Sequence, residues 1–60
     1  MDTYYGVIYF RDGRRIETAN CCGAGAEQNA ERMTAQQFDQ YMRTATHDIF
    51  KPTRYEVKKR

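Results

Sequence analysis

The chain has 60 residues, of which 40% are hydrophobic and 30% charged, with a formal net charge of +2. A chain of this length forms one small domain, and this composition excludes a disordered or collagen-like protein. No apolar run approaches the ~18 residues of a membrane-spanning helix, and the first residues lack the pattern of a signal peptide. We therefore expect a cytoplasmic protein with no membrane partner.

Two strands joined by a tight turn are expected in the first third of the chain. Residues 4–11 are dense in aromatic and β-branched side chains, which favour a strand. Asp12 and Gly13 then form the dipeptide that a two-residue type I′ turn prefers, because both central positions need a positive φ. A second strand is predicted over residues 14–21.

The main helix is predicted over residues 34–49, from a signal at its start. Thr34 can accept a hydrogen bond from the amide of Gln37, and Gln37 can reach back to the amide of Thr34, which makes a capping box. Met33 and Phe38 stand at the positions of a hydrophobic staple around that start. The sequence therefore places the helix start at Thr34.

The remaining segments follow from composition and from proline. Residues 22–33 are rich in glycine and alanine and are predicted to form a connector. The apolar positions before Met33 lie at a different helical phase from those after it, which supports two separate pieces. Pro52 stops the helix, and residues 53–59 alternate as a third strand.

The predicted fold is a single α+β domain with the element order ββαβ. The first strand is apolar on both faces, which is typical of a central strand, so the three antiparallel strands take the order 2-1-3. One helix covers only one face of the sheet. The first face of the central strand carries Tyr4, Ile8 and Phe10, and the second carries Tyr5, Val7 and Tyr9.

The second face is the predicted protein-contact surface. Tyrosine is enriched at interfaces, so Tyr5, Val7 and Tyr9 would bind a partner protein or a second copy, most simply as a homodimer. The alternative is that these tyrosines are only partly exposed to solvent and bind nothing, which their amphipathic rings tolerate. Gln36 and Gln40 belong to a nearly uncharged helix face and are added as contact residues.

Basic side chains near the hairpin and the C-terminus suggest a nucleic-acid contact as the alternative function. Arginines flank the predicted hairpin turn, and a ribbon of this kind can grip phosphates. Edge-strand charges also protect against aggregation, which is the competing explanation. The candidate residues are Arg11, Arg14, Arg15, Lys51, Arg54, Lys58, Lys59 and Arg60.

Catalysis, metal binding and cofactor binding are not expected. Cys21 and Cys22 are adjacent and lack a second cysteine pair, so they do not form a zinc motif, and we expect both thiols to be reduced. His47 lies opposite the apolar stripe of the helix and is expected in solvent. Gly23 and Gly25 lack the third glycine of a dinucleotide fingerprint. We expect no enzyme, no cofactor and no small-molecule substrate.

By elimination, the sequence favours a small non-enzymatic binding protein that acts as an adaptor, regulator or inhibitor. Phage- and plasmid-encoded modulators of host machinery, anti-CRISPR inhibitors among them, share this general profile of size and composition without a match of residues. The alternative is a small nucleic-acid-binding protein that uses the basic hairpin and the basic C-terminal strand.

Overall fold

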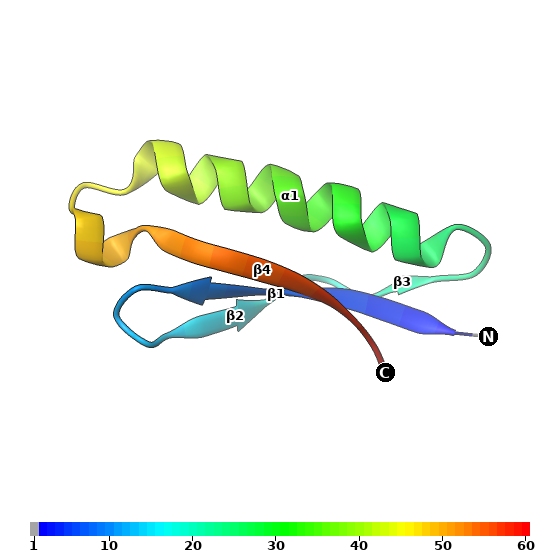
Figure 1. Ribbon diagram of the computed structural model, residues 1–60. Coiled ribbons are helices and arrows are strands. Elements are labelled where there is room, and N and C mark those ends of the chain that lie inside the picture. The colour runs from blue at the N-terminus through cyan, green and yellow to red at the C-terminus, as the bar shows by residue number, and fades with distance from the viewer. Residues whose placement is uncertain (1) are drawn as a thin grey trace.

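A long helix lies along one face of an antiparallel sheet in the computed structural model, which describes residues 2–60 (Figure 1). This arrangement confirms the predicted α+β class with one helix on one face. The elements in chain order are β1 (Thr3–Phe10), β2 (Arg15–Glu17), β3 (Cys21–Cys22), α1 (Ala26–Thr44), the 3-10 turn η1 (Asp48–Phe50) and β4 (Pro52–Lys59).

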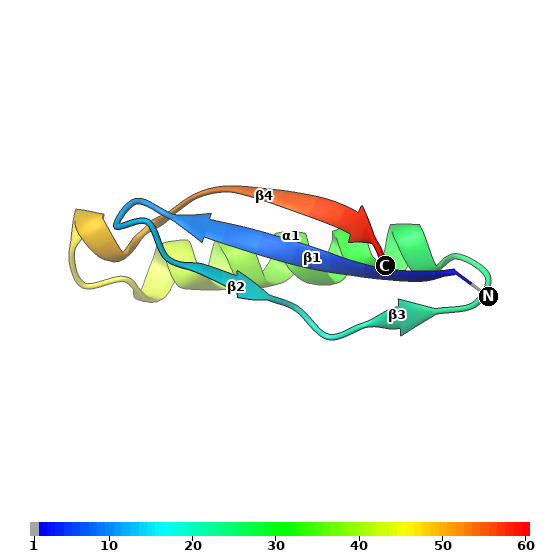
Figure 2. The same ribbon diagram turned by 90° about the horizontal axis from the view of Figure 1, so that it is seen from below.

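Strand β1 is the centre of the sheet. It pairs with β4 along nearly its whole length, from Tyr4 opposite Lys59 to Phe10 opposite Pro52. On its other side β1 pairs first with β2 and then with β3, which follow each other along the same edge (Figure 2). The predicted central position of the first strand is therefore confirmed, with four strands in place of three.

The β1–β2 hairpin has a three-residue loop, so the predicted type I′ turn is wrong. The amide of Gly13 donates to the carbonyl of Phe10 at 3.1 Å, and the amide of Phe10 donates to the carbonyl of Arg14 at 2.8 Å. Gly13 has a φ of 94°, whereas no non-glycine residue among those described, Asp12 included, has a positive φ. A three-residue hairpin loop usually consists of a type I turn followed by one residue in the left-handed conformation, which is the place of Gly13 here.

The predicted continuous strand over residues 14–21 is wrong because Thr18 interrupts it. The backbone amide of Gly6 donates to the side-chain Oγ1 of Thr18 at 2.8 Å, while the amide of Thr18 donates to the carbonyl of Gly6 at 2.8 Å. A hydroxyl thus takes the place of a backbone carbonyl. The chain leaves the ladder at this point and returns only at Cys21.

The predicted helix start at Thr34 and the predicted connector 22–33 are also wrong. Helix α1 begins at Ala26, after Gly25, and no side chain caps it. Thr34 lies in the middle of the helix with no solvent exposure, and its Oγ1 donates to the carbonyl of Ala30 at 2.6 Å. The capping box is therefore absent, because Thr34 bonds backwards along a helix that has already begun.

The sheet-facing stripe of α1 is continuous once Thr34 is counted with the apolar residues. The residues Ala26, Ala30 and Thr34 are buried and are spaced four apart, and Phe38 continues the row. Each step of four residues turns ~40° beyond a full circle, so such a row drifts slowly around the helix. That drift suits a twisted sheet and explains the apparent phase break in the sequence.

The predicted helix end at residue 49 is wrong as well. Helix α1 ends at Thr44, because Ala45 takes an extended backbone conformation with ψ of 128°. A separate 3-10 turn, η1, follows, and Lys51 is again extended before Pro52. A residue that precedes proline avoids the helical region, so the chain passes directly into β4.

The helix and the sheet meet most closely where Gly6 faces Thr34. A Cβ atom placed on Gly6 would lie 1.7 Å from the Oγ1 and 2.6 Å from the Cβ of Thr34. Such distances are shorter than any real contact, so only glycine fits beneath the helix at this point. The buried apolar residues are few and mostly modest in size: Val7, Ile8, Phe10, Ala26 and Ala30.

We expect Gly6→Ala to lower the free energy of unfolding by ~1–3 kcal/mol, because an added methyl overpacks this contact. In a domain of this size that change lowers the melting temperature by roughly 4–8 °C per kcal/mol. Thermal unfolding followed by circular dichroism measures it. Gln36→Ala on the exposed helix face is the control and should change stability by less than ~0.5 kcal/mol. An unaltered melting temperature for Gly6→Ala would contradict the close contact.

Candidate functional site

The helix-free face of the sheet carries the predicted contact residues Tyr5, Val7 and Tyr9. Val7 lies at the centre of this face, opposite Glu17 on β2 and Glu56 on β4. Only 2% of Val7 is exposed, whereas both tyrosines are half-buried. Because no helix covers this face, the residues that bury Val7 must come from the strands and from the segments next to them.

Arg60 covers Tyr5 and links the two edges of the sheet. Its guanidinium carbon lies 4.0 Å from the centre of the Tyr5 ring, within the range of a cation–π interaction. The same side chain donates from Nε to Oδ1 of Asn20 at 2.8 Å and from Nη2 to Oε1 of Glu17 at 2.9 Å. Arg60 follows β4, so its side chain crosses the central strand to reach the opposite edge.

Arg54 covers Tyr9 in a similar way. Its guanidinium carbon lies 3.9 Å from the centre of the Tyr9 ring, and it forms an ion pair with Glu56. The Tyr9 hydroxyl donates to the Oε2 of Glu56 at 3.2 Å. The hydrogen bond from Arg54 is the largest cause that lowers the pKa of Glu56 below its ordinary 4.5, and the bond from Tyr9 adds to it.

The predicted contact residues therefore fall on two separate surfaces. Tyr5 and Tyr9 lie under arginine side chains on the sheet, and Val7 is buried between them. Gln36 and Gln40 are exposed on α1, in the other layer of the molecule. The structure does not bring the two groups together, and whether either group binds a partner stays a prediction.

Large exposed apolar side chains gather instead at the end of the molecule where α1 stops. Ile49 is 55% exposed and Phe50 41% exposed in η1, and Tyr41 and Met42 are exposed in the last turns of α1. Figure 1 shows η1 beneath this end of the helix and beside the β1–β2 hairpin. We call this region the apolar end.

A hollow of about 270 Å³ opens at the apolar end. Arg14 stands at its side, with its guanidinium carbon 5.1 Å from the ring centre of Phe10 and 6.0 Å from that of Phe50. The ring of Tyr41 meets Phe10 edge-on, with centres 5.3 Å apart. The lining residues are Phe10, Arg14, Ile16, Tyr41, Thr44, Ala45, Thr46 and Phe50.

Most of the basic residues considered for nucleic-acid contact have an acidic partner. Arg14 pairs with Asp12 at 2.7 Å across the hairpin loop, and the backbone amide of Arg14 is the first cause that lowers the pKa of Asp12. Among residues 2–60, Arg11 and Arg15 alone of these candidates form no ion pair. The other pairs are Lys51–Asp48, Arg54–Glu56, Lys58–Glu56, Lys59–Asp2 and Arg60–Glu17.

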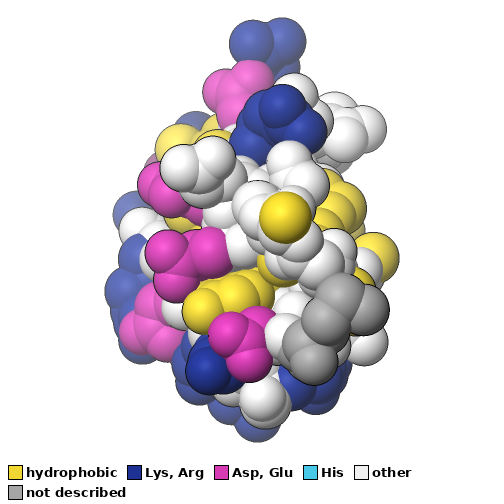
Figure 3. Space-filling view, turned by 90° about the vertical axis from the view of Figure 1, so that its right-hand side faces the viewer, with side chains coloured by type: hydrophobic (Ala, Val, Ile, Leu, Met, Phe, Trp, Pro, Cys, Tyr) yellow, Lys and Arg dark blue, Asp and Glu magenta, His cyan; other side chains and the backbone are white. Residues whose placement is uncertain are grey.

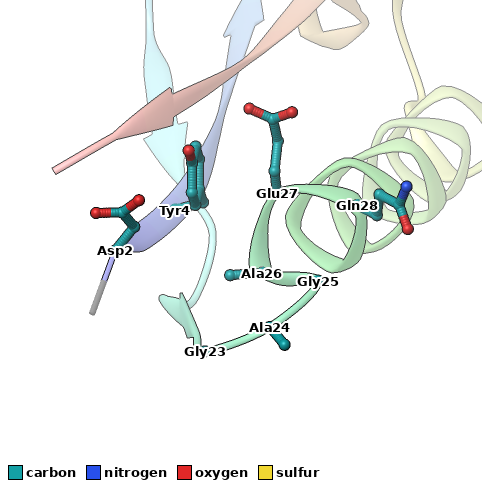
Figure 4. Close-up of a pocket in the computed structure, with 8 residues that line it drawn as sticks. All are labelled: Asp2, Tyr4, Gly23, Ala24, Gly25, Ala26, Glu27 and Gln28. Carbon is teal, nitrogen blue, oxygen red and sulfur yellow. The ribbon is translucent and has the colours of Figure 1, made fainter.

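A second hollow, of about 570 Å³, lies at the start of α1 (Figure 4). It is lined by the side chains of Asp2, Tyr4 and Glu27 and by the loop that contains Gly23 and Gly25. Figure 3, which looks at this end, shows acidic side chains beside hydrophobic ones. Carboxylates oppose an anion at a helix start, so this hollow does not resemble a phosphate site.

The residues singled out for possible chemistry lie apart. Cys21 and Cys22 are free thiols in β3, and the Sγ of Cys22 lies 3.4 Å from the Oγ1 of Thr3. His47 lies before η1, where its ring meets that of Phe50 with centres 5.9 Å apart. The described part of the chain holds no group of three or more His, Cys, Asp or Glu side chains arranged for a metal ion.

The apolar end could not be predicted from a helix over residues 34–49. In one such helix Tyr41, Met42 and Ile49 share the apolar stripe that faces the sheet, whereas α1 ends at Thr44 and all three are exposed. Thr44 and Thr46 are the signal in the sequence for an earlier helix end, since β-branched residues weaken a helix.

No helix among residues 2–60 is long and apolar enough to cross a membrane.

Comparisons of the chain with protein-family models, with curated proteins and with solved structures gave no match. The function is therefore inferred from the geometry of the described residues alone.

The contact of Arg54 with Glu56 gives a test by pH titration. We expect the carboxyl of Glu56 to titrate with a midpoint below 4.5 in the wild type, and to move back upward in Arg54→Gln. Because the pKa of Glu56 is lower in the folded state, its ionised carboxyl stabilises the folded state at pH values above its ordinary pKa of 4.5. This stabilisation is lost as the pH falls through the folded-state pKa. Carboxyl carbon shifts in an NMR titration measure both midpoints. An identical midpoint in the two proteins would contradict the interaction.

Proposed function

We propose that this chain is a small non-enzymatic cytoplasmic binding protein that regulates or inhibits a partner protein through direct contact. The apolar end is its principal contact surface. The observation that carries the proposal is the joint exposure of Tyr41, Met42, Ile49 and Phe50 beside a hollow of about 270 Å³. Exposed apolar side chains grouped in this way are typical of interaction sites, whereas single exposed ones need no explanation.

The charge around the apolar end indicates the chemistry of the partner. Arg14 lines the hollow and lies over the rings of Phe10 and Phe50. Arg11, which has no acidic partner among residues 2–60, follows Phe10 in the same hairpin, whereas Arg15 lies opposite Tyr9 on the helix-free face. An apolar side chain flanked by acidic residues would complement this surface, with the apolar group in the hollow and the carboxylates at the arginines.

A protein partner fits these observations better than a nucleic acid does. The ion pairs that involve Lys51, Lys58, Lys59 and Arg60 neutralise much of the basic C-terminal segment. Phosphate binding depends on basic side chains free to replace counterions. The sheet face with Tyr5, Val7 and Tyr9 remains a second predicted contact surface and is tested alongside the apolar end.

Site-specific photo-crosslinking in cells that produce the chain tests the proposal. A photoreactive phenylalanine analogue replaces Phe50 at the apolar end, Tyr9 on the sheet face, or the exposed Glu31 of α1 as the matched control. We expect one protein to be cross-linked from position 50 and not from position 31. The cross-link should disappear when Arg11→Glu and Arg14→Glu are combined, and it should survive nuclease treatment.

Three outcomes would contradict the proposed surface. Equal cross-linking from positions 50 and 31 indicates an unspecific contact, and cross-linking from position 9 alone moves the contact surface to the sheet. Recovery of nucleic acid with binding that falls steeply as salt increases would favour the nucleic-acid alternative. Circular dichroism of each variant shows whether a lost cross-link reflects a lost fold.

A further inference from the structure

The hollow at the apolar end is lined by three aromatic rings and by one charged side chain. Phe10, Tyr41 and Phe50 supply the rings, Arg14 supplies the charge, and none of the described lining residues is acidic. A group that enters this hollow therefore meets aromatic walls and one guanidinium. Such a lining disfavours a cation, because Arg14 repels it, and favours an apolar group that is attached to an anion.

Three contacts hold the guanidinium of Arg14 beside the hollow. Its Nε donates to the Oδ2 of Asp12 at 2.7 Å, and its carbon lies 5.1 Å from the ring centre of Phe10 and 6.0 Å from that of Phe50. The backbone amide of Arg14 donates to the Oδ1 of the same carboxylate at 3.1 Å, so Asp12 is fixed as well. Among residues 2–60, Nη1 and Nη2 of Arg14 have no acceptor. These two nitrogens form a fork that can donate to both oxygens of one carboxylate.

Thr46 adds further donors to the lining of the hollow. It lies between the end of α1 and the start of η1, where the chain makes no helical hydrogen bonds. Neither its backbone amide nor its hydroxyl has an acceptor within the described part of the chain. A backbone amide and a hydroxyl beside an arginine complete the kind of donor set that binds a carboxylate.

The acidic side chains at this end of the molecule are paired and do not cancel its positive charge. Over the hairpin loop, the last two turns of α1 and residues 45–51, four basic side chains stand against three acidic ones, a net charge of +1. Arg11 alone of the four has no acidic partner among residues 2–60. The pairs are Arg14–Asp12, Arg43–Asp39 and Lys51–Asp48.

We infer that the apolar end binds the C-terminus of the partner protein. The last side chain of the partner, large and apolar, lies in the hollow, and its terminal carboxylate accepts hydrogen bonds from the fork of Arg14 and from Thr46. Asp12 is a positioning residue, because it holds the other side of the guanidinium. This inference rests on the proposed function and names the part of the partner that the same site recognises.

A C-terminal residue suits the hollow better than an internal acidic residue does. Arg14 lies over two of the rings that line the hollow, so the anion that it binds must stand directly beside the apolar group. A C-terminal residue carries its side chain and its carboxylate on the same carbon atom. An internal aspartate or glutamate carries the carboxylate on a neighbouring residue, so two side chains must be ordered in place of one, at a larger cost in entropy.

Synthetic peptides test the inference. The first is acetylated Gly-Ser-Gly-Ser-Phe with a free carboxylate, the second is the same peptide with a C-terminal amide, and the third ends in alanine with a free carboxylate. The fourth has an internal Phe-Glu pair and a C-terminal amide. Binding is measured by titration, from the NMR shifts of the backbone amides of residues 44–51. We expect the first peptide to bind at least ~10-fold more tightly than each of the others, because they lack the terminal charge-assisted hydrogen bonds or the apolar anchor.

The variant Arg14→Gln identifies the group that binds the carboxylate. It should bind the acid and the amide peptide equally, whereas the matched control Arg43→Gln, at an exposed arginine of the same end, should retain the preference for the acid. Equal affinity of the two variants for the amide peptide shows that the hollow is intact in both. Arg14→Lys, which keeps the charge without the fork, should show an intermediate preference. If Arg14→Gln does not fold, the wild type and Arg14→Lys decide the result.

Several outcomes would overturn the inference. They are no binding of the first peptide by the wild type, equal affinity for the acid and the amide, tighter binding of the internal Phe-Glu peptide, and an unchanged preference in Arg14→Gln. A cross-link from position 50 that survives deletion of the partner's last residue would overturn it too. Each of these results leaves the proposed function standing as long as position 50 cross-links a protein. Absence of that cross-link, with the peptide preference intact, would instead refute the proposed function.

Discussion

The contact between Gly6 and Thr34 sets the distance between the two layers of this protein. A side chain on residue 6 would overlap Thr34, so the helix can lie this close only because the central strand carries a glycine there. The facing helix positions Ala26 and Ala30 are small as well and are almost fully buried. Close packing of small residues gives a thin molecule, and it leaves little volume between the layers for large side chains.

The large side chains are consequently displaced toward the end where the helix stops. The ring of Phe38 packs at a tilt against Tyr55, and Phe10 meets Tyr41 edge-on, but Ile49 and Phe50 remain exposed. On the helix-free face, where no second helix is present among the described residues, arginine side chains cover the tyrosines.

Much of the fold could be predicted from the sequence, because the two apolar faces of β1 identify a central strand and Asp12-Gly13 identifies a hairpin. The helix boundaries could not, because Thr34 satisfies a local capping pattern while its burial depends on Gly6, which is distant in the sequence. The arginine cover was missed for a similar reason. Arg60 reaches Glu17 and Tyr5 only after the sheet has formed, and no local pattern links these residues.

Thr18 gives the divided edge of the sheet a further property. Its hydroxyl accepts the bond from Gly6 that a backbone carbonyl accepts elsewhere, and its own amide donates to the carbonyl of Gly6, so this one residue joins the edge to β1 at its middle. On either side of this point, β2 is anchored through the hairpin and β3 through the start of α1. We therefore expect each of these short strands to open from β1 separately, so that amide hydrogen exchange along this edge shows two openings, while the longer β1–β4 ladder exchanges more slowly.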